Sequence, residues 1–577
     1  MITYQWMLRP VDDPDAVARL ARELNHLPEA LARALVVRGI TTFEAARRFF
    51  RPSREDLHDP FLMQDMEAAA HRVVAALERG ERILVYGDYD VDGTTATTLL
   101  THFLRSRGAD VHYFVPHRFR DGYGLGPAGI EAAAAFGAAL IVALDCGITA
   151  VEEAAAIRAR GMDLVICDHH TAHETLPDAV AVLDPKRPDC SYPFKELCGC
   201  GVTFKLVQAV LTRLGEPAEA AFDYLDLVAV ATASDIVPMT GENRILMREG
   251  LERLRQARPG LRALAEAAGI DLQAATTSNL VFGIGPRINA AGRLDEARLA
   301  VDLLLADDPG EARTLARRLE ALNDRRREID EATLQQAIRQ AEQQLNARDR
   351  RALVLHHPEW HLGVIGIVAS RIVERFYRPT ILLTSLDDQV KGSARSIRGV
   401  NIFDALATCS DLLVAFGGHD YAAGLTLDEA DLPLFRERFE EAIRAAASDD
   451  LFLPALEVDA LLDLNDIDNR FWAVLRQFAP CGPGNPTPVF QARDLAVVGT
   501  PRTVGRDGKH LKFAVRQRQG GATLPVIGFG LHRRLPAVEQ SAREGRPLEL
   551  VFSVDENTWN GQTTLQLRAR DVRLADR

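Results

Sequence analysis

The sequence predicts an α/β protein with two α/β domains that are joined by long helices and followed by a small β-barrel. Three features of the chain lead to this fold class. Apolar runs alternate with helical stretches from about residue 82 and again from about residue 351. Between these regions, residues 308–348 are rich in Ala, Arg, Glu and Gln, which is typical of long surface helices. After about residue 455, short alternating runs are separated by Gly, Asp and Asn, the pattern of a small barrel or sandwich.

The composition is that of a folded protein with reduced cysteines. The 577 residues suffice for about three to five domains, and 47% hydrophobic residues can fill several cores. Seven cysteines occur at scattered spacings, so we expect free thiols rather than a disulfide framework. No apolar run reaches membrane-spanning length, and the first residues do not resemble a signal peptide, so we expect a cytoplasmic protein.

The net charge of −13 argues mildly against a nucleic-acid-binding protein, because such proteins often have a basic surface. The objection is weak, since net charge averages over the whole chain. A metal site needs clustered carboxylates, and a local basic groove can lie on an acidic protein.

The chain divides into five expected regions. Residues 1–75 carry leucines near helical spacing and should form an N-terminal helical segment. Residues 76–305 should form the first α/β domain, in which RILVY, VHYFVP, ALIVALD and MDLVICD predict parallel strands and YLDLVAVATASDIVP predicts a buried helix ending near Asp235. Residues 306–350 should be linking helices, 351–455 the second α/β domain and 456–577 the barrel.

Three acidic motifs each follow a predicted strand of the first α/β domain. They supply Asp88, Asp90 and Asp92 in YGDYDVDG, Asp145 in ALDCG, and Asp168, His169 and His170 in CDHH. Ligands of open parallel sheets bind outside the carboxyl ends of the strands, so the motifs should converge on one crevice. Asp235, at the end of the predicted buried helix, can supply a fourth arm.

Such a cluster favours bound metal ions. A single Asp after a strand is usually a helix cap or turn residue, and Asp88 is the member best explained in that way. Several converging carboxylates are different, because they repel one another and some would have to protonate unless divalent cations are present. A mixed set of Asp and His suits Mn²⁺, and a bridging carboxylate such as Asp145 can hold two metals that act on a phosphate ester. The first motif resembles part of a calcium-binding EF-hand loop, but it lacks the required Glu and follows a strand, so calcium is not expected.

These motifs occur in the order that is found in the DHH phosphoesterase superfamily, whose name describes the triplet at residues 168–170. GDYDVDGTTAT, DCG, DHH and ASDIVPM are followed by GPRINAAGR at 285–293, KGSARSI at 391–397 and GGHDYAAG at 417–424. The last two resemble the DHHA1 substrate-binding domain. FAPCGPGNPTPVF at 478–490 resembles the start of the C-terminal OB-fold in the bacterial single-strand-specific DNA exonucleases of this superfamily. The resemblance covers nearly the whole chain.

The resemblance implies a 5′→3′ exonuclease specific for single-stranded DNA. Such an enzyme uses two Mn²⁺ or Mg²⁺ ions, hydrolyses phosphodiester bonds to 5′-mononucleotides, and serves recombination and repair. The implied metal ligands are Asp90, Asp92, Asp145, His169 and Asp235, with Asp145 bridging the ions and Asp88 as an optional ligand. The implied catalytic residues are Asp145, His169, His170 and His419. Tyr86 stands where smaller family members often have His, so the first metal would be held differently here.

The two later motifs carry residues suited to holding phosphate. Their donors and close-approach glycines are Lys391, Ser393, Arg395, Ser396, Gly417 and Gly418. His419 can donate to a phosphate near the scissile bond, although its octapeptide also fits a tight turn with a packed aromatic. The family is thought to select a 5′ end through such a pocket. We predict that Arg118, Ser393 and Arg395 form it, with Arg287 and Arg293 as further candidates, although a surface Arg is by default a solvated charge.

The predicted barrel carries basic residues around its GRDGKH turn. They are Arg502, Arg506, Lys509 and Lys512. OB-folds bind single strands through basic grooves and stacked aromatics. The aromatic residues here are few (Phe513, Phe529, Phe552 and Trp559), and several should lie in the core, so the barrel is expected to guide a strand mainly by charge.

Two other functions stay open. One is a DHH enzyme that acts on small substrates such as short RNA, cyclic dinucleotides or pyrophosphate, although those chains are much shorter and lack the barrel. The other is a binding scaffold like the DHH relatives of eukaryotic replication that have lost metal ligands, although all expected ligands are present here. The resemblance also implies a single-strand-binding protein and a RecQ-type helicase as partners. We expect a monomer.

Overall fold

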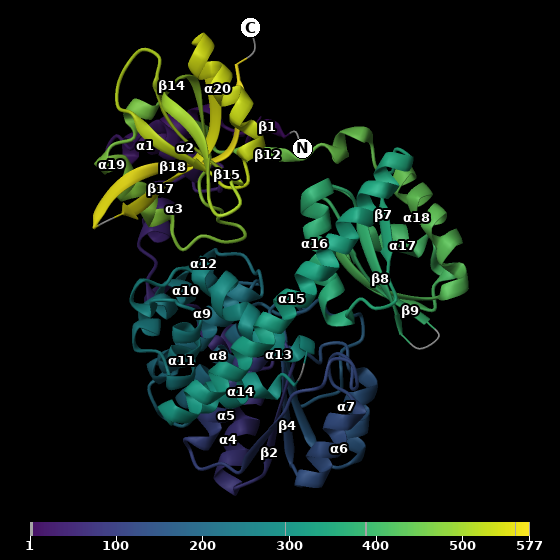
Figure 1. The fold of residues 1–577 in the computed structure, drawn as a ribbon. Coiled ribbons are helices and arrows are strands. Elements are labelled where there is room, and N and C mark those ends of the chain that lie inside the picture. Colours follow the sequence, from purple (N-terminus) through teal and green to yellow (C-terminus); the bar gives the residue numbers. More distant parts are fainter. Residues whose placement is uncertain (1–3, 295, 387–388, 560, 576–577) are drawn as a thin grey trace. The chain divides into compact units, whose positions relative to one another are not determined.

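The computed structural model describes residues 4–294, 296–386, 389–559 and 561–575. The chain divides into two compact units (Figure 1). Unit 1 consists of Met1–Arg51, Ala332–Ala479 and Pro486–Arg577, and unit 2 consists of Pro52–Glu331 and Pro480–Asn485.

Unit 2 is built on a five-stranded parallel sheet with the order β3-β2-β4-β5-β6. Its strands are β2 (Ile83–Gly87), β3 (Val111–Phe114), β4 (Leu140–Leu144), β5 (Asp163–Cys167) and β6 (Ala181–Leu183). The first four confirm the predicted runs, and β6 is an additional strand. The chain passes from β2 to β3 on one side and returns to β4 on the other, so a crevice opens at the carboxyl ends of β2 and β4.

Both faces of this sheet are covered, which explains why its strands are apolar throughout. Ile83 and Val85 point into a core with α4 (Met66–Arg79), α5 (Val91–Arg105) and α8 (Gly199–Arg213). Leu84 and Tyr86 point into a second core with α6 (Pro127–Phe136) and α7 (Val151–Ala159), on the opposite side of the sheet in Figure 1. The first core continues into α9 (Leu225–Ser234), α10 (Gly241–Arg253), α11 (Pro259–Ala267), α13 (Gly285–Leu294) and α14 (Arg298–Leu305). The short helix α12 (Thr277–Asn279) lies between α11 and α13 in the chain. Helix α9 confirms the predicted buried helix that ends beside Asp235.

A single helix of 39 residues, α15 (Pro309–Ala347), occupies the predicted linking region. The division between the two units falls within it, after Glu331. Its sequence contains neither Gly nor Pro after Gly310, so no residue interrupts the backbone hydrogen bonds. In the part of the chain that the structure describes, no helix is both long and apolar enough to cross a membrane.

The middle of unit 1 contains a mixed five-stranded sheet with the order β10-β11-β9-β8-β7. Its strands are β7 (Leu353–His356), β8 (Thr380–Leu386), β9 (Gln389–Arg395), β10 (Ala415–His419) and β11 (Ala422–Asp428). Only β7 and β8 run parallel, and the remaining pairs are antiparallel. The helices are α16 (Leu362–Phe376), α17 (Ile402–Ala407) and α18 (Leu432–Ala446). A second α/β domain is therefore confirmed.

The C-terminal strands of unit 1 close into a five-stranded barrel. They are β14 (Phe490–Val504), β15 (His510–Gln517), β16 (Leu524–Gly528), β17 (Leu548–Trp559) and β18 (Gln562–Leu574). Closure occurs because β14 pairs with both β15 and β17. Two short helices, α19 (Asn469–Leu475) and α20 (Leu535–Glu544), and the short strand β13 (Ala460–Leu461) accompany the barrel. The predicted OB-type barrel is thus confirmed.

The N-terminal segment completes the core of the barrel. Its helices are α1 (Pro14–Glu23), α2 (Glu29–Val36) and α3 (Phe43–Phe50). Leu31 and Leu35 of α2 lie in the same hydrophobic cluster as Phe490 and Phe552 of the barrel. The segment is not helical throughout as predicted, because Gln5–Leu8 forms β1 and pairs with β12 (Ala455–Val458).

Candidate metal centre

The loops after β2, β4 and β5 carry the three acidic motifs at the carboxyl edge of the unit 2 sheet. Gly87 pairs with Leu144, and Leu144 pairs with Cys167 on the next strand. Asp88, Asp145 and Asp168 each follow one of these residues in the chain. The sheet therefore brings the motifs side by side, as predicted.

The N-terminus of α8 holds Asp92 in place. The N–H groups of Gly199 and Cys200 donate to the two carboxylate oxygens of Asp92 at 2.5 and 2.8 Å. The positive end of a helix dipole favours a charged carboxylate at this position. Gly199 also approaches Asp145 so closely that a Cβ there would lie 2.7 Å from the Asp145 Cβ. Any larger residue at 199 would displace Asp145.

Asp145 has a left-handed backbone with φ of 60°, which is uncommon for a residue other than glycine. Its N–H donates to the carbonyl of Cys167 at 2.8 Å, so the residue still belongs to the edge of the sheet. Its Oδ1 lies 3.2 Å from Nε2 of His169. Backbone strain of this kind persists where the surroundings enforce it, and it concentrates at functional sites.

Asp168 holds the two histidines of its motif. Its Oδ2 accepts a hydrogen bond from the N–H of Ile148 at 2.9 Å, and its Oδ1 accepts from the N–H of His169 at 2.7 Å and from Nδ1 of His170 at 2.6 Å. Burial acts to raise the pKa of Asp168, but the hydrogen bonds from His170 and Ile148 bring it below its ordinary value. Asp168 therefore positions the histidines as a charged carboxylate.

His169 lies at the centre of the acidic cluster. Its Nε2 is 3.2 Å from Asp145 Oδ1, 3.6 Å from Asp235 Oδ2 and 3.8 Å from Asp92 Oδ2. Burial lowers the pKa of His169 to about 4, so the imidazole is neutral at pH 7. The neutral ring is the form that binds metals.

The facing donor atoms fit a metal ion better than they fit one another. Among the described residues, the cluster contains five buried atoms without a hydrogen-bond partner: Asp88 Oδ1, Asp145 Oδ1, Asp235 Oδ2 and both ring nitrogens of His169. A buried polar group left unsatisfied costs about 1–3 kcal/mol. A divalent cation satisfies the three carboxylate oxygens and one ring nitrogen of His169, because a neutral imidazole has a lone pair on one nitrogen and a proton on the other.

When no cation is bound, the buried carboxylates repel one another, and this repulsion raises their pKa values. Burial, together with the neighbouring Asp90, raises the pKa of Asp88 well above its ordinary value. Burial and Asp92 do the same for Asp145, and they raise the pKa of Asp235 to about 9. Carboxyl groups in such a site take up protons or bind cations.

The ligand atoms fall into three overlapping sets, each within 4.8 Å: Asp88, Asp90 and Asp145; Asp92, His169 and Asp235; and Asp145, His169 and His170. Asp145 belongs to the first set and lies against His169 of the second. Two ions that share one carboxylate need this arrangement. Asp88 lies with the ligand atoms, and it is Asp90 whose side chain caps α5, accepting from the N–H of Gly93 at 3.0 Å. The helix cap expected of Asp88 is therefore provided by Asp90, and the role of Asp88 as a ligand stays a prediction.

His170 and Tyr123 form a polar pair at the rim of the cluster. Nε2 of His170 lies 3.2 Å from the Tyr123 hydroxyl, and 40% of the His170 side chain is exposed. Burial acts to lower the pKa of His170, but the hydrogen bond and charge of Asp168 raise it above its ordinary value. His170 is thus suited to donate a hydrogen bond to an anionic substrate.

Two of the predicted arginines lie beside the cluster. The guanidinium of Arg118 lies 4.9 Å from the centre of the Tyr89 ring, and its charge acts to lower the pKa of Asp88. Burial raises the pKa of Tyr89 to about 12 against the charges of Arg118 and Arg293. Gly292 packs against the Tyr89 carbonyl, which brings the end of α13 to the same loop.

Arg287 does not lie where we predicted it. The residue is buried, its Nη2 donates to Glu320 Oε1 at 2.9 Å, and its Nη1 donates to the carbonyl of Gly283 at 2.7 Å. Contact with phosphate would break this buried ion pair. The prediction of a phosphate contact was therefore wrong, and Arg287 joins α13 to α15.

Strands β9, β10 and β11 bring the two phosphate-type motifs of unit 1 together. Arg395 on β9 and His419 on β10 both lie opposite Ala422 of β11. Nη1 of Arg395 donates to Oγ of Ser393 at 2.9 Å. A Cβ at Gly366 of α16 would lie 2.9 Å from Nη2 of Arg395 and 3.0 Å from Oγ of Ser393. The helix can approach these two side chains because residue 366 is glycine.

The other predicted residues of these motifs differ in their surroundings. Lys391 lies on the same face of β9 as Ser393, two residues away. His419 is exposed, and Gly418 has φ of 144° with a Cβ position only 2.3 Å from the Ala422 carbonyl, so only glycine fits there. Gly417, which pairs with Gly424, has open space at its Cβ position. The hydroxyl of Ser396 donates to the carbonyl of Val400 at 2.6 Å and shapes the turn instead.

Basic side chains form a row across the barrel. Arg502 lies opposite Lys512, Lys512 opposite Ile527, and Ile527 opposite Arg568. Directly opposed residues share one face of a sheet. Phe529, with 52% of its surface exposed, extends this face, and the guanidinium of Arg568 lies 5.1 Å from the centre of its ring.

The remaining barrel residues also have defined places. Arg506 and Lys509 are exposed in the turn between β14 and β15, where Lys509 pairs with Asp507 at 3.0 Å. Phe513 and Phe552 are buried, as expected for core aromatics. The side chain of Trp559 lies outside the described residues.

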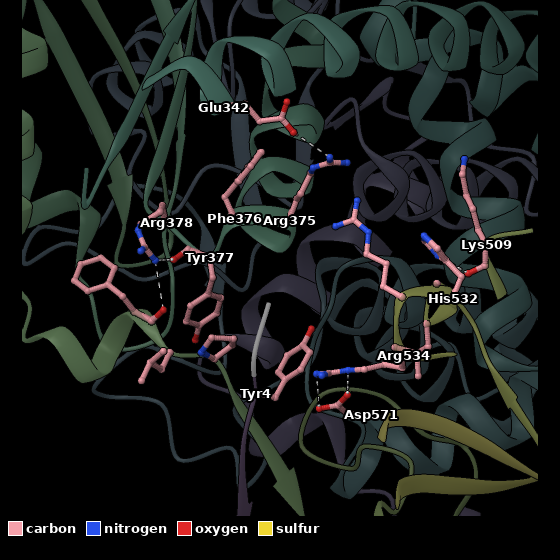
Figure 2. Close-up of a pocket in the computed structure, with 16 residues that line it drawn as sticks. Tyr4, Glu342, Arg375, Phe376, Tyr377, Arg378, Lys509, His532, Arg534 and Asp571 are labelled. Atoms are coloured by element: carbon pink, nitrogen blue, oxygen red, sulfur yellow. Dashed lines mark hydrogen bonds and ion pairs between the residues drawn. The ribbon is translucent and has the colours of Figure 1, made fainter. Parts of the chain in front are cut away.

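Unit 1 contains a pocket of about 920 Å³ lined largely by basic and aromatic side chains (Figure 2). The basic lining residues are Arg375, Arg378, Lys509, His532, Arg533 and Arg534. Two carboxylates offset them in part, since Arg534 pairs with Asp571 at 2.9 Å and Arg375 with Glu342 at 3.3 Å. This excess of positive charge suits an anionic ligand, and none of the acidic cluster residues lines the pocket.

Two residues near the centre were not identified from the sequence. Tyr123 lies in the loop after β3, and the GYGLG segment that follows VHYFVP was the available signal. Asp184 follows β6 at the same sheet edge, and burial raises its pKa to about 7. The short run AVAVLD could have revealed it, but β6 has only three residues.

Three family models match the chain. The DHH family, N-terminal domain, matches residues 82–232, the DHHA1 domain matches residues 349–445, and the RecJ OB domain matches residues 458–571.

Curated proteins and solved structures match over almost the whole length. The single-stranded-DNA-specific exonuclease RecJ of Bacillus subtilis (strain 168) is 38% identical over 98% of this chain and 70% of its own length. The Escherichia coli (strain K12) protein of that name is 37% identical over 96% of both chains. The crystal structure of RecJ in complex with Mn²⁺ from Thermus thermophilus has a TM-score of 0.82 at 33% identity and covers 100% of this chain and 80% of that one. The complex with Mg²⁺ has a TM-score of 0.77 at 31% identity, covering 100% and 79% of the two chains.

We expect the metal-free protein to lose stability as the pH rises from about 4 towards 9. The raised pKa values of the cluster carboxyls mean that the folded state binds more protons than the unfolded state between the ordinary aspartate pKa of about 3.9 and the value of about 9 at Asp235, so stability falls with rising pH. Mn²⁺ should therefore raise the melting temperature more at pH 8 than at pH 6, as measured by scanning fluorimetry against EDTA. Asp145→Asn should reduce the Mn²⁺ effect, whereas the surface variant Asp110→Asn should retain it. Equal Mn²⁺ shifts in Asp145→Asn and the wild type would contradict the assigned centre.

Proposed function

Because this chain belongs to the RecJ family of single-stranded-DNA-specific exonucleases, we propose that it removes 5′-mononucleotides successively from the 5′ end of single-stranded DNA. The chain is a phosphodiester hydrolase that acts in DNA recombination and repair. The observation that carries the proposed mechanism is the convergence of carboxylates on His169 at the carboxyl edge of the unit 2 sheet.

Two divalent ions, Mn²⁺ or Mg²⁺, are the proposed cofactors. The proposed ligands are Asp90, Asp92, Asp145, His169 and Asp235, with Asp88 as a further ligand. When bound, such a pair of ions activates a water molecule and stabilises the negative charge that develops on phosphate. The complexes of the Thermus thermophilus protein with each ion support this choice.

The chain's own residues orient the substrate and the ligands. Asp168 fixes both histidines through hydrogen bonds, and the low pKa of His169 keeps its ring available to a metal. Nε2 of His170, beside Tyr123, is the proposed donor to the scissile phosphate. His419, exposed on β10, and Arg118, beside Asp88, are proposed to contact substrate phosphates from unit 1 and unit 2 respectively.

A DNA strand labelled at one end tests the polarity of cleavage. With Mn²⁺ or Mg²⁺, a 5′ label on a long single strand should appear early as mononucleotide, and a 3′ label should appear late. EDTA should abolish release. Asp145→Ala should reduce it by at least about 10³-fold, because a shared ligand contributes several kcal/mol. Early release of the 3′ label, or turnover of dinucleotides alone, would refute the proposed substrate.

Recognition of the 5′-terminal phosphate is proposed for Ser393 and Arg395 on β9, with Lys391 on the same face. Their hydrogen bond orients the guanidinium, and the first turns of α16 lie against both side chains at Gly366. A helix N-terminus adds backbone N–H groups and a favourable dipole for an anion. Arg293 is the further proposed phosphate contact in unit 2.

Arg395→Ala should reduce the preference for a 5′-phosphorylated over a 5′-hydroxyl strand by roughly 10- to 100-fold, since a charge-assisted hydrogen bond contributes about 1.5–3 kcal/mol. The measurement is the ratio of kcat/KM for the two substrates. Gly366→Ala should act in the same direction by displacing Arg395. Arg398→Ala is the matched control, because this exposed arginine of the same segment pairs with Glu457 instead. A preference that survives Arg395→Ala unchanged would exclude the pocket.

The barrel is proposed to hold the strand beyond the cleaved end. Arg502 and Lys512 supply charge, and exposed Phe529 supplies a ring for stacking. Arg506 and Lys509 extend the charged surface into the neighbouring turn. The barrel thus combines both elements of single-strand binding by OB-folds, although aromatic residues are few.

The contributions of charge and of stacking to DNA binding by the barrel should differ in their dependence on salt concentration. Lys512→Ala should weaken binding of a long single strand and reduce the slope of log affinity against log salt by about 0.7 for each lost phosphate contact. Phe529→Ala should weaken binding by roughly 5- to 100-fold at an unchanged slope, because stacking contributes about 1–3 kcal/mol per base. Fluorescence anisotropy with Asp145→Ala as the parent measures both. Arg543→Ala on α20 serves as control, and unchanged affinity in Lys512→Ala and Phe529→Ala would exclude this face.

A single-strand-binding protein and a RecQ-type helicase are the proposed partners, because both generate or protect the single strands that such an exonuclease consumes. We further propose that the enzyme works as a monomer in the cytoplasm, where its DNA substrate lies.

A further inference from the structure

Ile236 combines two unfavourable features directly after a proposed metal ligand. It follows Asp235, the C-cap of α9, and has a left-handed backbone with φ of 62°. Glycine is usual at this position of a helix end, and a β-branched residue is strained there. The Ile236 side chain is 72% exposed, so burial does not offset the strain.

The chain around Ile236 is held from its C-terminal side. Nδ2 of Asn243 donates to the carbonyl of Pro238 at 3.0 Å, and the N–H of Met239 donates to the carbonyl of Pro483 at 2.6 Å. These contacts keep the short loop between α9 and α10 in one conformation. The strained residue is therefore presented to solvent beside the metal centre.

A second exposed apolar side chain lies on an adjoining segment. Phe282 is 75% exposed and occupies the middle of a π-helical turn, Leu280–Ile284. The flanking Leu280 and Ile284 are buried and anchor this turn. Short π-helical turns are frequent at functional sites, because they change the direction of individual side chains.

Arg287 fixes this turn against α15, and Gly285 lets the turn approach the end of α9. Its Nη1 binds the carbonyl of Gly283 within the turn, while its Nη2 binds Glu320 on α15. A Cβ at Gly285 would lie only 2.6 Å from Oγ of Ser234, the last residue of α9. Gly285, directly after the turn with Phe282, therefore packs against Ser234, two residues before Ile236.

We propose that Ile236 and Phe282 contact the nucleobases next to the scissile phosphate. This inference rests on the proposed function, which supplies single-stranded DNA as the substrate. Unpaired bases expose apolar faces, and apolar or aromatic side chains bind such faces without regard to sequence. The acidic cluster repels a phosphate backbone until cations are bound, so base contacts add affinity without altering the charge of the centre. Bases within a duplex do not offer these faces, so the contacts also favour single strands.

Ile236→Gly distinguishes a base contact from a structural role. If Ile236 contacts a base, the variant should be more stable than the wild type but should bind single-stranded DNA more weakly. Glycine tolerates the left-handed backbone. The melting temperature of the unfolding transition that Mn²⁺ shifts should therefore increase by roughly 2–4 °C. Loss of the base contact should raise KM for single-stranded DNA roughly tenfold, which corresponds to about 1.4 kcal/mol, with little change in kcat. Mn²⁺ affinity, measured by the same thermal shift, should stay unchanged.

Abasic substrates identify the contacted group. A wild-type enzyme that uses the bases should show a roughly tenfold higher KM for a strand whose first two nucleotides are abasic. Ile236→Gly and Phe282→Ala should show less than a twofold difference between the abasic and the intact strand. Val180→Gly is the matched control, since Val180 is β-branched and 40% exposed but lies before β6, at the amino end of the sheet.

The outcomes are distinct. A higher melting temperature together with a higher KM and lost sensitivity to abasic sites supports the base contact. A higher melting temperature with unchanged KM and retained sensitivity to abasic sites overturns it. A lower melting temperature overturns it as well, because Ile236 then has a structural role. Failure of the wild type to cleave the intact strand removes the proposed function, and the base contact falls with it.

Discussion

The mutual repulsion of buried carboxylates at one edge of a parallel sheet is the constraint on which the arrangement of unit 2 depends. Asp88, Asp145 and Asp235 have raised pKa values because they are buried next to other carboxylates. Within the described residues, no arginine or lysine forms a direct ion pair with these three carboxylates, although the charges of Arg118 and Lys186 act to lower the pKa of Asp88 and of Asp235 respectively. Neutral His169 lies among them instead, and five of their buried atoms have no partner within the described residues. A site of this kind stores unfavourable electrostatic energy that divalent cations release.

Two features of the surrounding structure hold the carboxylates in place: the close approach of α8 and the strained backbone of individual residues. The N-terminus of α8 stabilises Asp92 and comes within contact of Asp145 only because residue 199 is glycine. Asp145 and Ile236 both have left-handed backbones at the borders of the centre. The two left-handed backbones lower the stability of the metal-free protein, and both the strain and the close approach fix the direction of a side chain. At these two residues the fixed geometry of the candidate metal centre is therefore accompanied by lower stability.

Unit 1 contributes basic surface to a chain whose net charge is −13. The row from Arg502 to Arg568, the pair formed by Ser393 and Arg395, and the pocket in Figure 2 concentrate positive charge locally. Acidic side chains elsewhere maintain the overall negative charge. Such separation lets one chain hold both a cation site and a polyanion, because electrostatic attraction acts over about 10 Å at ordinary ionic strength.

The sequence by itself determined the order of domains, the four main strands of the parallel sheet and the acidic motifs that meet at its edge. These features depend on local patterns, since apolar periodicity predicts a strand and the carboxyl ends of parallel strands must adjoin. It did not reveal that Arg287 binds Glu320, that Phe529 is exposed while Phe513 is buried, or that Ile236 has a left-handed backbone. Residues 5–8 and 181–183 are too short for their periodicity to be read, and their pairing depends on distant segments. Only the tertiary structure decided these points, because the partner and the exposure of a side chain are set by residues far away in the chain that folding brings into contact.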